Sequence, residues 1–254
     1  MKKISVITGA SSGLGTELLR HAVRLHPEID EFWIIARREE KLKKLASEYP
    51  DKKIIPFPLD LSDISSFEAY KSALESSGAE LSLLINNAGC GTIGDLADMQ
   101  YRTQTNMVDL NVRALTAMTT ISLPFMKKGG VILNVCSIAS FAPNPRMTVY
   151  CSTKAYVLSF TKSLRYELKD KKINVCAVCP GPMDTEFLPV AGIGKGVSKT
   201  FDTLPRCDVS KTAYGALKAA YSGHTVYTPK LFYKFYRFIC KILPHSLIMP
   251  MSKT

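Results

Sequence analysis

A short segment near the N-terminus is rich in small residues and reads Thr8-Gly9-Ala10-Ser11-Ser12-Gly13-Leu14-Gly15. An apolar run precedes this segment and a helix-like stretch follows it. Glycine permits a tight turn and a close approach of ligand to backbone, and the free N–H groups at a helix start attract phosphate. Turns between strand and helix are often rich in Gly and Ser, but this context favours a dinucleotide site. The residues expected at the pyrophosphate are Gly9, Ser11, Ser12, Gly13, Leu14 and Gly15.

Two arginines, Arg37 and Arg38, follow the second apolar run. Enzymes that use NAD commonly place a carboxylate here to hold the ribose 2′-OH. Guanidinium groups pair instead with a 2′-phosphate, which a carboxylate would repel. The sequence therefore favours NADP(H), with the alternative that both arginines open the next helix facing water. Asp60, at the end of the third run, could accept a hydrogen bond from the adenine amino group, and Leu61 is placed at the same site.

These residues need a scaffold, and short apolar runs alternate with helix-like stretches along the chain. The runs are rich in Val and Ile and lack polar alternation, which is typical of parallel strands buried on both faces. This rhythm predicts an α/β fold: a single Rossmann-like, doubly wound parallel sheet with helices on both faces. The expected strands are Ile4–Thr8, Phe32–Ala36, Ile54–Pro58, Leu81–Ile85, Val131–Cys136, Ile173–Cys179 and Thr225–Tyr227. The expected helices include Glu39–Tyr49, Ile64–Ser77, Ala155–Lys169 and Val209–Tyr221.

Further motifs follow the glycine segment in a definite order, including a serine, Ser137, placed thirteen positions before Tyr150. The sequence resembles the short-chain dehydrogenase/reductase family from Ser5 to about Tyr227. Any one motif could arise by chance, whereas the ordered combination is highly specific. The motifs are Thr8–Gly15, Asp60, Asn86–Gly89, Asn111, Ser137, Tyr150–Lys154 and Pro180–Thr185.

The resemblance implies an oxidoreductase that moves a hydride between nicotinamide and a carbonyl or alcohol carbon. It makes Tyr150 the proton donor that a ketone oxygen requires. Lys154, four residues further along a helix-like segment, would lower the tyrosine pKa and bind the nicotinamide ribose. Ser137 would hold the substrate oxygen, and Asn111 would sustain a proton path through water to Lys154. Taken singly, each residue has an ordinary explanation, such as a surface pair or a helix cap.

The same resemblance assigns the remaining cofactor contacts. Asn87, Ala88 and Gly89 are expected beside the adenosine and ribose, although a plain turn after a strand would also explain them. A later loop is expected against the nicotinamide, with its threonine bonding the carboxamide, and the family pattern implies pro-S hydride transfer. The loop residues are Pro180, Gly181, Met183 and Thr185, and Tyr150 and Lys154 also contact the cofactor.

Cysteine and histidine usage gives no sign of a metal or disulfide site. The seven cysteines are an odd number, as expected for reduced thiols in a cytoplasmic protein. Cys176 and Cys179 form a C-x-x-C inside an apolar run, where side chains three apart point to opposite faces of a strand. The four histidines fall in no motif. No apolar run approaches the ~18 residues that span a bilayer.

The C-terminal part is strongly basic within a chain of net charge +11. No acidic residue follows Asp208, and a basic end favours a local anionic partner over nucleic acid, with a solvated cationic face as the alternative. Residues 1–228 are assigned to the dinucleotide-binding domain and 229–254 to a basic, aromatic helical extension. Within it, the cations at 230, 234, 237 and 241 form one helical stripe among apolar residues. Three roles stay open for 230–243: covering the substrate pocket or a partner subunit, peripheral membrane contact, or plain core.

We therefore expect an NADPH-dependent reductase or dehydrogenase with an apolar substrate, such as a steroid, a 3-oxoacyl group or another lipid-like ketone. Substrate selectivity should depend on 139–148 and 188–205. The resemblance implies a homodimer or homotetramer that assembles through helices at Asn106–Lys127 and Ala155–Lys169. The alternatives are a catalytically silent NADPH-binding regulator and a membrane-surface scaffold. A sugar-nucleotide epimerase would usually need a longer chain.

Overall fold

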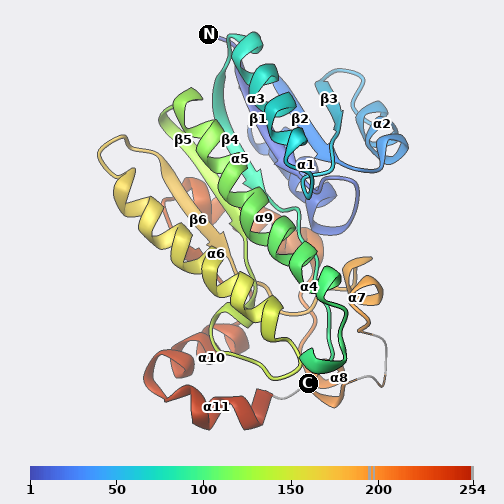
Figure 1. Cartoon of the computed structure of the whole chain (residues 1–254). Coiled ribbons are helices and arrows are strands. Elements are labelled where there is room, and N and C mark those ends of the chain that lie inside the picture. Colours follow the sequence, from blue (N-terminus) through green and yellow to red (C-terminus); the bar gives the residue numbers. More distant parts are fainter. Residues whose placement is uncertain (194–195, 197, 253–254) are drawn as a thin grey trace.

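Seven parallel strands form one sheet in the order β3-β2-β1-β4-β5-β6-β7 (Figure 1). The computed structural model of the chain describes residues 1–193, 196 and 198–252. The expected class is confirmed: an α/β fold with helices on both faces of a doubly wound sheet. The strands are β1 (Lys3–Thr8), β2 (Glu31–Ala36), β3 (Lys53–Pro58), β4 (Glu80–Asn86), β5 (Met126–Val135), β6 (Asn174–Val178) and β7 (Val226–Tyr227).

The strand order reverses beside β1, which pairs with β2 on one side and β4 on the other. Val6 is paired with Trp33 of β2 and with Leu84 of β4. The chain leaves β1 toward one face and leaves β4 toward the other, so their carboxyl ends diverge. Ligands of such sheets bind in the crevice that this reversal opens.

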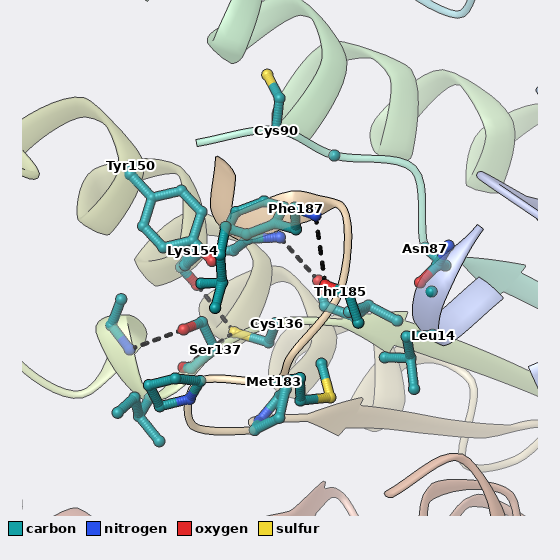
Figure 2. A pocket seen from close by; sticks show the side chains of 18 of the residues that line it. Leu14, Asn87, Cys90, Cys136, Ser137, Tyr150, Lys154, Met183, Thr185 and Phe187 are labelled. Atoms are coloured by element: carbon teal, nitrogen blue, oxygen red, sulfur yellow. Dashed lines mark hydrogen bonds between the residues drawn. The ribbon is translucent and has the colours of Figure 1, made fainter. Parts of the chain in front are cut away.

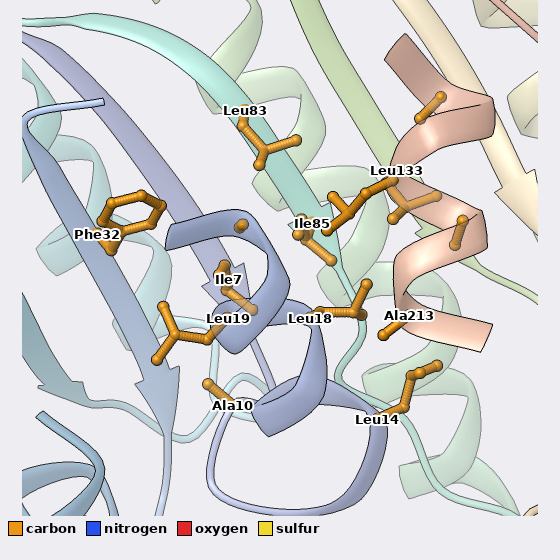
Figure 3. Close-up of a cluster of buried hydrophobic side chains, with 14 of the residues drawn as sticks. Ile7, Ala10, Leu14, Leu18, Leu19, Phe32, Leu83, Ile85, Leu133 and Ala213 are labelled. Atoms are coloured by element: carbon orange, nitrogen blue, oxygen red, sulfur yellow. The ribbon is translucent and has the colours of Figure 1, made fainter. Parts of the chain in front are cut away.

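Helices cover both faces because successive strand residues point to opposite sides. On one face, α1 (Gly13–Leu25), α2 (Glu39–Ser47) and α9 (Val209–Tyr221) bury leucine and alanine side chains against the sheet. Figure 3 shows Leu14, Leu18 and Ala213 of this cluster. The helices of the opposite face are α3 (Ser65–Ser77), α4 (Tyr101–Val108), α5 (Ala114–Ser122) and α6 (Thr148–Glu167).

The two cysteines of the C-x-x-C, one in β6 and one directly after it, pack on opposite faces, as predicted. Cys176 packs in the cluster beneath α1 and α9, whereas Cys179 packs against residues of α6 and the C-terminal segment. All seven cysteines are free thiols.

The segment Asn106–Lys127 is helical as far as Phe125, but it is not one regular α-helix. A π-helical turn, Asp109–Arg113, separates α4 from α5, and a short 3₁₀ turn at Leu123–Phe125 follows. Pro124 lacks the N–H that would continue an α-helix. The next strand then begins at Met126, which pairs with Leu81, five residues earlier than expected.

The C-terminal helices α10 (Leu231–Ile242) and α11 (His245–Ser252) lie at the end of the molecule that also carries α7 (Phe187–Val190) and α8 (Lys199–Thr203) (Figure 1). Tyr233 anchors α10: it is fully buried and donates to the Pro205 carbonyl at 2.8 Å. Many apolar side chains of α10 are exposed, so the helix is not plain core. Among the described residues, no helix has the length and apolar character needed to cross a bilayer.

Candidate active site

The glycine segment forms the turn between β1 and α1, and two of its glycines have a left-handed backbone: φ is +66° at Gly9 and +57° at Gly13. Other residues adopt such angles only with strain. Gly15 is required for space, because a Cβ there would collide with the Gly9 carbonyl oxygen. The backbone is therefore bare where a pyrophosphate would meet the start of α1.

Residues after β4 are hydrogen-bonded onto this turn. The Thr8 hydroxyl accepts the N–H groups of Asn87 and Ala88 at 2.9 and 3.0 Å. The Asn87 side-chain amide donates to the carbonyls of Thr8 and Gly9 at 2.9 and 3.0 Å. A Cβ on Gly9 would also strike Ala88. Two segments 79 residues apart thus form one rigid wall.

Arg38 lies over the serines of the glycine segment. It donates to Ser11 Oγ at 3.1 Å and to Ser12 Oγ at 2.9 Å. Its guanidinium also pairs with Glu186 at 2.8 Å, and Lys41 pairs with the other Glu186 oxygen at 2.7 Å. Hydrogen bonds from Lys41 and Arg38 lower the pKa of Glu186 to about 2. Two cations thus face one anion where a ribose phosphate would lie.

Lys41 and Glu186 are functional candidates that the sequence reasoning missed. Their spacing carries no motif, because 145 residues separate them. For Lys41, its position one helical turn after Arg37 and Arg38 was the available signal.

Arg37 and Asp60 occupy the same end of the cleft. The Arg37 guanidinium is largely exposed and lies 4.0 Å from an Asp60 oxygen. The other Asp60 oxygen accepts the Ser62 backbone N–H and hydroxyl at 2.9 and 2.6 Å. Leu61 is buried beside them in the cleft wall. The adenine contact predicted for Asp60 stays a prediction.

Asn111 lies in the π-helical turn, a feature that often marks functional sites. Its amide donates to the Cys90 carbonyl at 2.8 Å and to Thr153 Oγ1 at 3.1 Å, and its oxygen accepts the Cys90 N–H at 2.9 Å. Asn111 therefore ties the loop after β4 to α6. A Cβ on Gly89 would lie 3.0 Å from Asn111 Oδ1 and 3.6 Å from Lys154 Nζ, so the two groups are neighbours. The proton path predicted here stays a prediction.

Ser137, Tyr150 and Lys154 come together in the cleft (Figure 2). Tyr150 and Lys154 are one turn apart on α6, and Lys154 Nζ lies 5.7 Å from the Tyr150 ring centre. The Lys154 ammonium donates to the Val135 carbonyl at the end of β5 at 3.0 Å. Ser137 lies two residues after the end of β5, and its hydroxyl accepts the Ala139 N–H at 3.1 Å. All three side chains are almost completely buried.

Burial governs the titration of this group. It raises the pKa of the Tyr150 phenol, which a hydrogen bond from the Ser137 side chain lowers only in part. Burial also lowers the pKa of Lys154. The phenol therefore stays protonated at neutral pH, and the lowering of its pKa that was predicted for Lys154 stays a prediction. Tyr150 is therefore in the protonated form that can donate a proton.

The loop after β6 closes the cleft between these two ends. Figure 2 shows Met183, Thr185 and Phe187 between Tyr150 on one side and Leu14 on the other. The Thr185 side chain packs against Gly13, where a Cβ would lie 3.2 Å from it. Gly181 has a role beyond the cofactor, because the Tyr233 ring occupies the space that its Cβ would need.

One continuous cleft, of about 650 Å³, joins all these groups. Its wall contains every predicted cofactor and catalytic residue except Gly15 and Asn111, which support the wall from behind. Beyond Tyr150 the wall becomes apolar and uses residues that no motif identified. They are Ala142, Met147, Phe187, Leu188, Val190, Ile193, Phe201, Leu204, Phe232, Tyr236, Ile239, Leu243, Leu247 and Ile248. Gly194, within the segment 188–205, lies outside the described residues.

Metal chemistry has no support in the described part of the chain. Within 1–193, 196 and 198–252, no three His, Cys, Asp or Glu side chains are grouped so that they could hold a metal ion. The donor set instead suits a nicotinamide dinucleotide: bare glycine backbone, two serines and a cationic end.

A family model described as short chain dehydrogenase matches residues 3–201. The chain belongs to this family. Among its relatives, the NADP-dependent 3-hydroxy acid dehydrogenase of Schizosaccharomyces pombe is 36% identical over 192 residues, which are 73% of each chain. This short-chain dehydrogenase is therefore an oxidoreductase that acts on hydroxyl or carbonyl groups with a nicotinamide cofactor.

Solved structures agree with the fold. A short-chain dehydrogenase from Sphingobium yanoikuyae in complex with NADPH is 25% identical, with a TM-score of 0.78 over 96% of this chain and 97% of that one. The 3-ketoacyl-(acyl-carrier-protein) reductase from Brucella melitensis, complexed with NADH, is 27% identical, with a TM-score of 0.77 over 89% and 96%. Because proteins of this fold bind either NADPH or NADH, the side chains around the ribose must determine which of the two is bound.

Proposed function

We propose that this short-chain dehydrogenase reduces an apolar ketone with NADPH, and that Tyr150 gives the proton to the substrate oxygen. One observation carries the proposal: a single cleft joins a cationic dinucleotide cradle, a buried Ser137–Tyr150–Lys154 group and an apolar chamber, in that order. A bound NADPH would supply the hydride that reaches the carbonyl carbon.

The side chains of this chain have separate tasks in that reaction. The Ser137 hydroxyl, next to the phenol, would donate to the substrate oxygen and stabilise the charge that develops on it. Tyr150 would release its proton to the same oxygen. The ammonium of Lys154 would stabilise the phenolate that remains, because an opposite charge within a few ångströms favours the ionised form. Asn111 holds the surrounding loop in place.

The preference for NADPH rests on Arg38 and Lys41. Both pair with the Glu186 carboxylate, so both can reach one anion at the same point. A ribose 2′-phosphate offers the same kind of acceptor with more charge. The NADP-dependent relative from Schizosaccharomyces pombe supports this choice.

The proposed substrate class follows from the far end of the cleft, whose side chains are aromatic and aliphatic. Burying each methylene of a substrate in such a chamber contributes about 0.8 kcal/mol. We therefore favour a ketone on a long alkyl chain or a fused ring system, such as a 3-oxoacyl or steroid compound.

Two further expectations are kept as proposals. Helices α4 and α6 present partly exposed rings, including the stacked pair Tyr156 and Phe160 of α6, which suits a homodimer or homotetramer. The seven free thiols suit the reducing cytoplasm.

A chain-length series tests the function. NADPH oxidation is followed with methyl ketones of increasing alkyl length and with one short, polar ketone. We expect kcat/KM to rise roughly threefold to fourfold per added methylene until the chamber is filled. Equal values along the series, or a preference for the polar ketone, would rule out an apolar substrate.

A further inference from the structure

Helix α10 carries three lengthwise stripes that differ in chemistry. Neighbouring residues of an α-helix point about 100° apart, so sets that share a spacing but are shifted by one residue occupy adjacent faces. The outer apolar stripe is Leu231, Phe235, Phe238 and Ile242. One position earlier runs the cationic stripe, Lys230, Lys234, Arg237 and Lys241. One position later runs the inner stripe, Phe232, Tyr236, Ile239 and Leu243.

The outer stripe faces solvent along the whole helix. Leu231 is 80% exposed, Phe235 64%, Phe238 57% and Ile242 61%. Leu247 of α11, which also lines the cleft, is more than half exposed as well. Large contiguous apolar surfaces of this kind are uncommon on soluble proteins and mark a contact with another phase or molecule.

The cationic stripe borders the outer stripe, and Lys230, Lys234 and Lys241 are exposed. No acidic residue follows Asp208 in the sequence, so the C-terminal segment holds no anion of its own to neutralise them. A second copy of this chain, related by a two-fold axis, would bring the same cations together at the contact. An anionic partner fits this surface better than a copy of it does.

The inner stripe lies on the other side of the outer stripe and belongs to the cleft. All four of its residues line the cleft wall. Phe232 and Leu243 are at the same time exposed, at 52% and 40%, so they form its rim. An apolar surface therefore runs without interruption from the outside of α10 into the chamber beyond Tyr150.

We propose that the outer and cationic stripes of α10 bind the surface of an anionic lipid bilayer. Phenyl rings would enter the interface, and the lysines would extend their ammonium groups to lipid phosphates. In this orientation the rim formed by Phe232 and Leu243 meets the membrane. Resting on the proposed function, the second part of the inference is that the ketone enters the chamber from the bilayer rather than from water.

Sedimentation of the full chain with vesicles tests the docking. Vesicles of phosphatidylglycerol and phosphatidylcholine are compared with phosphatidylcholine alone, at low and high salt. We expect binding to the anionic vesicles that salt weakens. Phe235→Ser with Phe238→Ser should lower the partition coefficient at least about tenfold. Lys234→Gln with Lys241→Gln should lower it roughly tenfold or more on anionic vesicles only.

Matched variants on α6 and just after it serve as controls. Lys162→Gln with Lys169→Gln removes the same charge from other exposed sites, and Tyr166→Ser removes an exposed ring there. Both should bind vesicles as the unmodified protein does. The proposal is overturned if the unmodified protein does not bind anionic vesicles, or if the control variants lose as much binding as the α10 variants. It is also overturned if light scattering shows a dimer that Phe235→Ser with Phe238→Ser dissociates, because the surface would then belong to a second copy.

Activity separates this inference from the proposed function. Phe235 and Phe238 are absent from the cleft wall, so their double variant should reduce a short, water-soluble ketone at the normal rate. Its kcat/KM for a long-chain ketone embedded in anionic vesicles should fall about as much as its vesicle binding. Equal rates on embedded ketone would refute delivery from the bilayer, even if vesicles are bound. If neither protein reduces any ketone, the proposed function fails while the sedimentation result still decides the docking.

Discussion

The two ends of the cleft are built in different ways. The cofactor end is made by residues 9–89, whose backbone lies against backbone at Gly9, Gly15 and Ala88. The substrate end is made by 187–204 and by the C-terminal helices, which contribute side chains, several of them half exposed. Close backbone contacts thus determine the shape of the cofactor end, whereas apolar side chains determine the shape of the substrate end.

The largest effect is expected where the two ends meet. Tyr150→Phe removes the proton donor and leaves the ring that packs 5.9 Å from Phe187. Turnover of any accepted ketone should fall about 10²- to 10⁴-fold. Fluorescence titration should give an unchanged NADPH affinity, since the variant removes only a hydroxyl group and keeps the ring in place. A scaffold or silent regulator would lose no function, and weakened NADPH binding would mean that Tyr150 also shapes the cofactor end.

The pH dependence should differ between the two directions of the reaction. Burial raises the pKa of Tyr150, so the protonated donor used in reduction persists through neutral pH and is lost only above the raised pKa. Oxidation of the alcohol needs the phenolate, which grows up to about tenfold per pH unit below that pKa. Initial rates from neutral to alkaline pH should therefore be flat for reduction and rise for oxidation. An acidic optimum for oxidation would contradict this assignment.

At the cofactor end, Arg38→Ala and Lys41→Ala should each raise KM for NADPH. Charge-assisted hydrogen bonds contribute about 1.5 to 3 kcal/mol, so we expect roughly 10- to 100-fold for Arg38 and less for Lys41, whose ammonium lacks the planar fork of a guanidinium. KM for NADH should stay the same. Lys44→Ala, an exposed lysine on the same helix, is the control. Equal losses for both cofactors would show that the arginine only supports the serine turn.

The smallest effect concerns Glu186. Its pKa of about 2 keeps it ionised at neutral pH, where it occupies Arg38 and Lys41. Glu186→Gln should therefore tighten NADPH binding by a few-fold, a modest gain because the pair is half exposed. NADH binding should not change. Glu39→Gln, a similarly exposed carboxylate that pairs with Lys43 instead, should alter neither cofactor's affinity. Weaker NADPH binding by Glu186→Gln would show that the carboxylate helps to position the cations.

The same contrast explains what could be read from the sequence. Strands such as β2 and β6 were predictable because buried parallel strands need unbroken apolar runs. Ser137 and Tyr150 were predictable because they keep a fixed order and spacing. The predicted end of the helix at Asn106–Lys127 was wrong, since Pro124 and the early pairing of Met126 end it sooner. Contacts such as that of Glu186 with Lys41 depend on how distant segments pack, which no local pattern encodes.

The structure of the C-terminal extension, residues 229–254, was also predictable only in part. Its helix and cationic stripe follow from periodicity. Its contact with the site does not, because it depends on Tyr233 filling the space above Gly181. That packing brings one face of α10 into the cleft and leaves the neighbouring face outside.

The central claim is that this cleft passes a hydride from NADPH to a carbonyl carbon. It is tested most directly with NADPH carrying deuterium at both positions of nicotinamide C4 and the best ketone of the chain-length series. Mass spectrometry of the alcohol should find one deuterium on the carbinol carbon, and Tyr150→Phe should yield almost none of this product. An alcohol without the label, or equal product from the variant, would contradict the account.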